Sequence, residues 1–402
     1  MDYSLVDRYA SEVSVKVLRT PQELEGIREA WESWPGPRDS DIDFYLMFIQ
    51  SYPRVLRPHV VVLYRNGHPD AILIGRLERT RVNSQIGYLR LSGIPARTLN
   101  FVYGGLRGNA SNENTSDLIT SVMQSLRSRE ADVAFLHQPS TDSFLYKAAL
   151  TQPGFWCLDR LSKPEEHHTM KLPEAADHLY QGLSKGLRGE LRRKKKKLLS
   201  DFDGRVTTRC YRLQSDLEIA LPHLEEVAKK TYQRGLRVGF QDTPQVRRRL
   251  EFCAQKGWLR IYVLYIDERP CSFSAGTVYN GVYTTDYIAY DPAYRDYYLG
   301  KLLLVEVIEA CYKGGVKEID FGFGQAEYKE RFGNCRLTES SVYIFAPNLK
   351  GFVVNVTRTV PGVIDKTLKA TLQRTRLLSN VKRFWRRHAG EHPPLLGGLR
   401  KN

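Results

Sequence analysis

The stretch from Asp320 to Lys329 brings together residue types that can transfer protons and stabilise negative charge. Asp320 stands at the end of a strand-like run, and Gly322 and Gly324 follow it. The adjacent pair Tyr328 and Lys329 comes next, on an expected short helix. A carboxylate, a phenol and an ammonium group suit acid-base and electrostatic catalysis. Because ligands often bind at the carboxyl ends of parallel strands, the stretch predicts a ligand site.

A second stretch, residues 290–301, lies between a strand-like run and a long helix and could bind an anion. Arg295 and Lys301 supply positive charge, and Gly300 lets a ligand approach the backbone closely. The first N–H groups of a helix attract anions by about 0.3 to 1 kcal/mol per charge, and up to about 2 kcal/mol when partly buried. The stretch indicates a phosphate site, but an ordinary glycine in a loop before a core helix fits it equally well.

Alternating and helical hydrophobic patterns define the elements that would position these residues. In the first half the patterns predict strands at 14–19, 59–65, 70–79 and 132–138 and helices at 21–34 and 116–129, with a hairpin turn at Asn66-Gly67. In the second half they predict helices at 183–202, 215–234, 243–257, 299–314 and 325–333 and strands at 205–212, 259–266, 271–279, 282–290, 316–321 and 339–346.

This second-half order, from a strand through two helices, three strands, a helix and a strand, resembles the GNAT superfamily of acyltransferases. The run DFGFGQAEYK, residues 320–329, is similar to the strand, glycine turn and Tyr-Lys pair of CelD-like (cellulose-biosynthesis-type) acetyltransferases, distant relatives of the Fem peptidyltransferases. The resemblance is good over 175–346 and fair over 13–150. It implies an α/β chain of two fused GNAT-like domains, each a mixed, mostly antiparallel sheet flanked by helices.

The resemblance also implies four parts along the chain. Residues 1–150 would form a degenerate N-terminal GNAT-like domain, and residues 151–180 a connection. Residues 181–346 would form the catalytic domain, and residues 347–402 a basic amphipathic tail.

For the site, the resemblance implies acyl-CoA as co-substrate. Tyr328 would protonate the leaving thiolate, and Lys329 would stabilise negative charge in the tetrahedral transition state. Neighbours on a helix point about 100° apart, so one of the two is expected to face the site. The coenzyme is expected to contact Ile288, Ala289, Tyr290, Arg295, Leu299, Gly300 and Lys301, although the last residues are spaced more widely than in the usual GNAT pyrophosphate motif.

Asp286 is the leading candidate for a general base. An amine acceptor with a pKa of about 10.4 must lose a proton before it attacks. Strand alternation places Asp286 on the same face as Ile288, and an acidic residue in a β-prone run must be paired or face solvent. A position at the sheet edge or surface fits Asp286 better than a catalytic one, and Asp320 and Glu327 are alternates.

The net charge of +15 is concentrated in two segments. Residues 181–200 carry +7 and residues 350–402 carry +10, which leaves about −2 for the rest of the chain. The run 192–197 favours a solvated basic face, but it could contact the coenzyme, an anionic acceptor, tRNA or phospholipid. Residues 353–387 resemble an interfacial helix, so an anionic membrane is a possible partner through 181–200 and 353–387; an extra docking helix or a disordered tail fits the tail as well.

Several protein classes do not fit the sequence. The six cysteines include no C-x-x-C pair, and adjacent His167 and His168 lack helical metal-site spacing, so we expect reduced thiols and no metal. No apolar run approaches the roughly 20 residues needed to cross a bilayer. We therefore predict a cytoplasmic protein, peripheral at most to the inner membrane face.

Together these patterns predict an acyltransferase that moves an acetyl or other acyl group from acyl-CoA to an amine or hydroxyl. The CelD-like similarity implies a small-molecule, sugar, glycolipid or cell-envelope acceptor. One alternative is a Fem-like transferase that uses aminoacyl-tRNA, although the helix at 183–202 is shorter than the coiled-coil arm of many Fem enzymes. Another is a non-catalytic membrane-docking protein with a decayed GNAT site.

Overall fold

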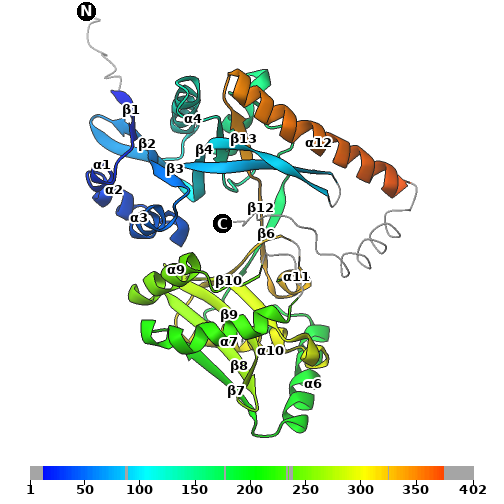
Figure 1. Ribbon diagram of the computed structural model, residues 1–402. Helices are drawn as coiled ribbons and strands as arrows, with labels where there is room; N and C mark the ends of the chain where they lie inside the picture. The colour runs from blue at the N-terminus through cyan, green and yellow to red at the C-terminus, as the bar shows by residue number, and fades with distance from the viewer. Residues whose placement is uncertain are drawn as a thin grey trace, which may run out of the picture. The chain divides into compact units, whose positions relative to one another are not determined.

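The computed structural model describes residues 12–86, 89–175, 178–231, 234, 239–324 and 326–374, which divide into two compact units (Figure 1). Within the described residues, unit 1 comprises 12–164 and 339–374, and unit 2 comprises 165–338. The chain thus leaves unit 1, builds unit 2 and returns. None of the described helices has the length and hydropathy needed to cross a bilayer.

Unit 1 is built on one sheet with the strand order β1-β2-β3-β4-β5-β13. Its strands are β1 (Val13–Leu18), β2 (Val55–Arg65), β3 (His68–Ile86), β4 (Leu89–Gly108), β5 (Val133–Leu136) and β13 (Val342–Phe345). Neighbouring strands are antiparallel except for the parallel pair β4 and β5. The predicted hairpin turn is confirmed, since Asn66 and Gly67 join β2 to β3 with positive φ angles of 51° and 80°.

Helices cover both faces of this sheet. They are α1 (Pro21–Glu25), α2 (Arg28–Ser33), α3 (Ile42–Ser51), α4 (Asn112–Arg127), α5 (Phe144–Thr151) and α12 (Leu349–Arg374), with 3₁₀ turns η1 (Arg38–Ser40) and η2 (Phe155–Cys157). Val60 and Val62 of β2 pack with α1 to α3, whereas Val61 and Leu63 pack with α4. The single helix expected at 21–34 is two helices, because α1 ends at its C-cap Gly26.

Unit 2 has a sheet of order β12-β6-β11-β10-β9-β8-β7. Its strands are β6 (Glu165–Lys171), β7 (Val206–Tyr211), β8 (Leu259–Ile266), β9 (Arg269–Tyr279), β10 (Val282–Tyr290), β11 (Glu318–Phe323) and β12 (Cys335–Glu339). Its helices are α6 (Lys185–Asp201), α7 (Leu217–Lys229), α9 (Pro244–Gln255), α10 (Leu299–Lys313) and α11 (Glu327–Phe332), with 3₁₀ turns η4 (Gln214–Asp216) and η5 (Pro292–Tyr297).

The two sheets share one plan. In each, four antiparallel strands lead to a parallel pair, β4 with β5 in unit 1 and β10 with β11 in unit 2. The strand beyond that pair is antiparallel in both and is out of sequence order: β13 from the end of the chain in unit 1, and β6 from before α6 in unit 2. The expected mixed α/β fold, with two mixed, mostly antiparallel sheets that are each flanked by helices, is confirmed.

These two strands depart from the boundaries predicted from sequence. The expected connection 151–180 contains β6, whose sequence EEHHTMK shows no apolar alternation. The strand expected at 339–346 pairs with β5 of unit 1 rather than with unit 2. Strand β12 was not predicted at all. The expected tail begins as α12, and its part beyond residue 374 lies outside the described residues.

Candidate active site

The parallel strands β10 and β11 separate along their length. They pair only at Val282, Tyr283 and Thr284 of β10, opposite Glu318, Ile319 and Asp320 of β11. Beyond this point β10 continues to Tyr290 paired with β9, and β11 continues to Phe323 paired with β6. The carboxyl ends of two parallel strands therefore part within the sheet, which is where a ligand can reach backbone groups.

A β-bulge lies just after the point of separation. Thr285 pairs with Gly276 and Tyr287 with Ala275, so Asp286 is an extra residue on β10. The expected placement of Asp286 was at a sheet edge or at the surface; strand β10 lies inside the sheet, so the edge placement is wrong. The bulge also breaks the alternation that placed Asp286 with Ile288. Bulges often redirect a side chain beside an active site, and Asp286 is half-buried here.

Helix α10 begins immediately after β10 and η5. Its N-cap residue, Tyr298, adopts the left-handed conformation (φ 60°, ψ 38°), and its side chain makes no capping hydrogen bond to the described backbone. No acidic residue stands in the first turn. A side chain in place of Gly300 would bring its Cβ within 3.3 Å of the Tyr290 ring. The side chain of the N-cap residue therefore does not satisfy the first N–H groups of α10.

Lysines from two helices gather at this helix start. Lys301 of α10 and Lys194 of α6 lie 4.8 and 4.5 Å from the Tyr298 ring centre. Lys197 lies 4.8 Å from the Tyr297 ring centre, and Lys194 donates to the carbonyl oxygen of Asp296. Most of the run 192–197 is exposed, as expected, but these two lysines contact the turn.

Asp320 contacts His167, a residue that was expected to lie in a linker. Its Oδ1 lies 2.6 Å from Nε2 of His167 on β6 and accepts a 2.6 Å hydrogen bond from the Gly322 N–H. His167 is buried, with its ring 4.4 Å from the Phe323 ring centre. A carboxylate held this way can orient an imidazole ring. His167 was missed because its partner is 153 residues away.

Tyr328 and Lys329 diverge, as their adjacent positions on α11 predict. Lys329 is buried and its Nζ donates a 2.6 Å hydrogen bond to the Phe323 carbonyl at the end of β11. The half-buried Tyr328 ring meets the Phe321 ring edge-on at 6.1 Å and packs on the unit 2 core. Of the pair, Lys329 places its polar group at the end of the separated strand.

An ionic network ties α6, α10 and α11 together. Glu327 accepts from Lys301 at 2.9 Å and from Arg331 at 3.0 Å, and Arg331 also contacts Glu190 of α6 at 2.6 Å. The hydrogen bond from Lys301 lowers the pKa of Glu327, and the bond from Arg331 lowers that of Glu190. Glu327, an alternate base in the sequence analysis, is therefore an ionised partner of Lys301.

The residues predicted to contact the coenzyme fall into two groups. Ile288, Ala289 and Tyr290 lie on β10 beyond its last pair with β11. Arg295 is 80% exposed on η5, so its guanidinium can meet a ligand in solvent. Leu299 is fully buried in the core, which leaves only its backbone N–H for a ligand. Within the described part of the chain, no three metal-ligating side chains cluster.

Comparison with known proteins finds a family match in this region. Residues 185–330 match the family model described as an acetyltransferase (GNAT) domain. No curated protein matches the chain. The matched segment contains the separated strands, the bulge, the α10 start and the Tyr328-Lys329 pair.

Solved structures extend the likeness to both units. FemX is 10% identical with a TM-score of 0.55, and the match covers 85% of this chain and 100% of FemX. The C-terminal domain (DUF2156) of an Agrobacterium fabrum protein assigned as a lysylphosphatidylglycerol synthetase is 13% identical with a TM-score of 0.50, covering 84% of this chain and 96% of that domain. At these identities the likeness concerns the fold.

Proposed function

We propose, from the premise that residues 185–330 are an acetyltransferase (GNAT) domain, that this chain transfers an acyl group from acyl-CoA to an amine or hydroxyl. The observation that carries the proposal is the separation of β10 from β11 directly before an uncapped, lysine-rich helix start. A thioester arm can lie along the separated strand while its phosphates meet α10. No other described helix start shares these features with a parallel strand pair that separates.

The phosphate end would be held by backbone and lysine groups. The N–H groups of Leu299 and Gly300 open α10, and Lys301 and Lys194 flank them. Two phosphates with several negative charges gain from both the helix dipole and the ammonium groups. Arg295, exposed on η5, would add a further contact from solvent.

The reacting end would lie near Lys329 and Asp286. The acceptor nitrogen or oxygen attacks the thioester carbonyl carbon and loses a proton to Asp286, directly or through water. The Lys329 ammonium, held by the Phe323 carbonyl, would stabilise the oxyanion of the tetrahedral intermediate. The carbon–sulfur bond would then break, and the thiolate would take a proton from solvent, because the Tyr328 ring packs on the unit 2 core. Asp320 would act through His167 as a positioning pair rather than as the base.

The helix α6 favours acyl-CoA over aminoacyl-tRNA as donor. It spans 17 residues and buries Leu187, Leu191 and Leu198 against unit 2, so it packs on the domain instead of projecting from it. Its Lys194 contacts Tyr298 at the α10 start, and its Lys197 contacts Tyr297 of η5. The CelD-like run 320–329 supports a sugar, glycolipid or cell-envelope acceptor. A tRNA donor remains the alternative that the FemX likeness suggests.

Ligand-induced thermal stabilisation tests the donor. Millimolar CoA and acetyl-CoA should raise the melting temperature, because a ligand that binds only the folded state stabilises it by RT ln(1 + [L]/Kd). An unshifted melting temperature at millimolar coenzyme would overturn the proposal. Stabilisation by charged tRNA, with a steep salt dependence, and none by coenzyme would instead support the Fem-like alternative.

A second proposed property, membrane docking, is supported by one face of α12. The helix exposes a stripe of apolar side chains, namely Leu349, Phe352, Val353, Val356, Val360, Val363 and Ile364. Trp156, 63% exposed, meets the Phe352 ring at 5.5 Å and extends the stripe. Exposed patches of this kind mark interaction sites. The sequence from 366 to 387 adds eight basic residues and no acidic one, which suits an anionic bilayer.

Vesicle sedimentation tests the docking. The protein should sediment with phosphatidylglycerol-containing vesicles more than with phosphatidylcholine vesicles, because about 1 kcal/mol of attraction comes from each basic residue near the surface. Val356→Asp with Val360→Asp should abolish sedimentation. Ile219→Asp, at a 54% exposed apolar site on α7 of unit 2, is the matched control and should have no effect. Equal sedimentation of all three proteins would refute docking through α12.

A further inference from the structure

The connection from β10 to α10 begins with a buried acid, Asp291. It is the N-cap residue of η5, and its Oδ1 accepts a 3.0 Å hydrogen bond from the Ala293 N–H. Its backbone N–H donates to the Cys271 carbonyl oxygen of β9 at 2.8 Å, and its carbonyl oxygen accepts from the Tyr294 N–H at 3.0 Å. These bonds fix the start of the turn that leads to α10. The cap requires an acceptor oxygen at this position, but it does not require a negative charge.

The charge of Asp291 conflicts with the proposed binding of phosphates after this turn. A 3₁₀ helix rises about 2 Å per residue, so the six-residue η5 places Asp291 roughly 14 Å or less from Tyr298 at the α10 start. Charges repel over such a distance at low salt, because the Debye length is about 30 Å at 0.01 M ionic strength. Asp296 of the same turn is 75% exposed, so water screens its charge better than that of the buried Asp291.

Lys230 supplies a counter-ion for Asp291 from another element. It is the C-cap residue of α7, and its Nζ donates a 2.9 Å hydrogen bond to Asp291 Oδ2, while Oδ1 stays on the cap. This hydrogen bond raises the pKa of Lys230, so the ammonium group stays charged. Lys230 also contacts Glu226 of α7 at 3.2 Å. One carboxylate therefore caps the turn with one oxygen and binds a cation with the other.

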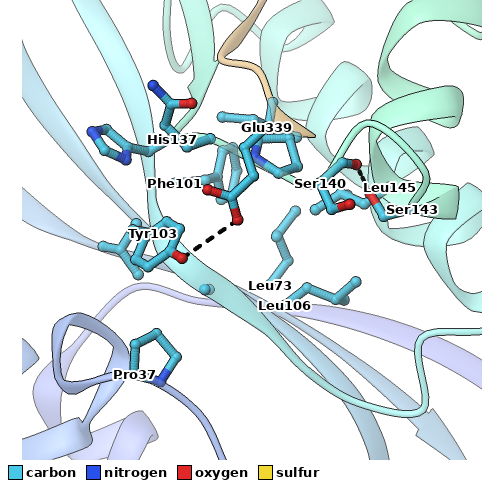
Figure 2. Close-up of a pocket in the computed structure, with 16 residues that line it drawn as sticks. Pro37, Leu73, Phe101, Tyr103, Leu106, His137, Ser140, Ser143, Leu145 and Glu339 are labelled. Atoms are coloured by element: carbon cyan, nitrogen blue, oxygen red, sulfur yellow. Dashed lines mark hydrogen bonds between the residues drawn. The ribbon is translucent and has the colours of Figure 1, made fainter. Parts of the chain in front are cut away.

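The corresponding strand separation in unit 1 has a different chemical character (Figure 2). Where β4 and β5 part, it opens a cavity of about 200 Å³ with an apolar floor of Leu73, Leu106 and Leu145. Among the described residues that line this cavity, none is a lysine or an arginine. Separation of the parallel strands therefore does not by itself bring positive charge to the site, and the pairing of Lys230 with Asp291 is a feature of unit 2.

We propose that Lys230 is a positioning residue for coenzyme binding, which neutralises Asp291 so that this acid can cap the phosphate turn without repelling the phosphates. Lys230 acts through Asp291 and does not need to touch the ligand. The inference rests on the proposed function, in which the α10 start takes the phosphates of acyl-CoA.

Removal of one charge from the end of α7 tests the proposal. Lys230→Met leaves Asp291 charged and without this partner, so calorimetric titration of the full chain with CoA at about 0.01 M ionic strength should show a Kd about fivefold higher. Lys229→Met makes the same charge change at the neighbouring residue, whose side chain is 65% exposed, and is the matched control. Its Kd should stay within twofold of that of the unaltered chain. Equal weakening in both variants, or an unchanged Kd in Lys230→Met, would overturn the proposal.

A second substitution separates neutralisation from a purely structural contact. Asp291→Asn keeps a side-chain oxygen for the cap and removes the charge. The double variant Lys230→Met with Asp291→Asn should therefore bind CoA within twofold of the unaltered chain, whereas loss of a structural contact would not be rescued. A double variant that binds no better than Lys230→Met would overturn the proposal.

Asp291→Asn alone decides the matter if Lys230→Met fails to fold. This variant keeps the cap and leaves the Lys230 charge in place, so it should bind CoA at least as tightly as the unaltered chain. A higher Kd in Asp291→Asn would overturn the inference. Absence of CoA binding by the unaltered chain would overturn the proposed function and this inference with it, whereas tight binding without rescue would overturn this inference alone.

Discussion

The helix that follows the separating strand starts differently in the two units. In unit 1, Ser111 caps α4 by accepting from the Asn114 N–H, and Glu113 stands in the first turn. In unit 2, the N-cap of α10 makes no side-chain capping bond to the described backbone, its first turn has no acid, and Lys301 stands there instead. The start of α4 is thus capped by a side chain of its own N-cap residue, and the start of α10 is not.

The surroundings of the two helix starts reinforce this difference. Beside α4, Asp70 accepts hydrogen bonds from Arg65, Asn109 and Asn114, which places further negative charge at that end of the helix. Beside α10, Lys194 and Lys197 arrive from α6. Under the proposed function, the same topology would offer a phosphate site in unit 2 and not in unit 1, as a degenerate N-terminal half would require.

Of the substitutions that test the difference between the two units, removal of the Lys329 ammonium group should have the largest effect, a loss of kcat. Lys329→Ala should lower kcat by about 100-fold or more, since a single oxyanion donor contributes about 10²–10³. Acetyl-CoA binding, measured by calorimetry, should change less than threefold. Lys301→Ala is the contrasting variant, expected to weaken coenzyme binding more than it lowers kcat. A Lys329→Ala enzyme with the rate of the unaltered chain would remove Lys329 from the site.

Acid should destabilise unit 1 through His59. Burial lowers the pKa of His59 to about 4, despite Glu130 at 3.9 Å. Its pKa is about 6.5 when unfolded, so the unfolded chain binds the proton first and stability falls as pH drops from about 6.5 to 4. The full difference is about 3 kcal/mol. Calorimetric scans should show the unit 1 transition losing stability over this range, and His59→Gln should flatten that loss. An equal slope in the variant would contradict the assignment.

Local patterns predicted the elements of unit 2 well but not the contacts that complete the site. Strands β8 to β10 and helix α10 follow from alternation, turns and an apolar stripe, which are signals within one segment. The pairing of β6 with β11, and with it the His167–Asp320 contact, joins segments about 150 residues apart. The bulge at Asp286 depends on the pairing register between β9 and β10. The run YTTDYI alone does not determine that register.

The repeated plan of the two units was predicted from the family resemblance, and no repeated sequence pattern shows it. The edge strands β1 and β7 occupy equivalent positions in the two sheets, yet their sequences VSVKVL and VTTRCY differ in composition. Equivalent strands thus share their pairing but not a sequence pattern. The exchange of β6 and β13 moves one strand of each sheet to a distant part of the sequence, which hides the repeat further.

Exchanging charge at the two helix starts tests their difference directly. Lys301→Glu should raise the Kd for CoA about tenfold, because it removes one attraction and adds one repulsion of about 0.3 to 1 kcal/mol each. Glu113→Lys in unit 1 makes the reverse change and should leave the Kd unaltered. Titration calorimetry of both variants measures this. Equal weakening in both would show that overall charge, rather than the α10 start, controls coenzyme binding.

Removing the cap of α4 should have the smallest effect, confined to unit 1. Ser111→Ala leaves the Asn114 N–H without its acceptor and should cost about 1 kcal/mol of unfolding free energy. The α10 start has no such side-chain cap to lose, so coenzyme affinity should stay constant. Differential scanning calorimetry with and without CoA separates the two quantities. A change in Kd for CoA in Ser111→Ala would mean that the unit 1 helix start takes part in binding, against the division of roles inferred from the two caps.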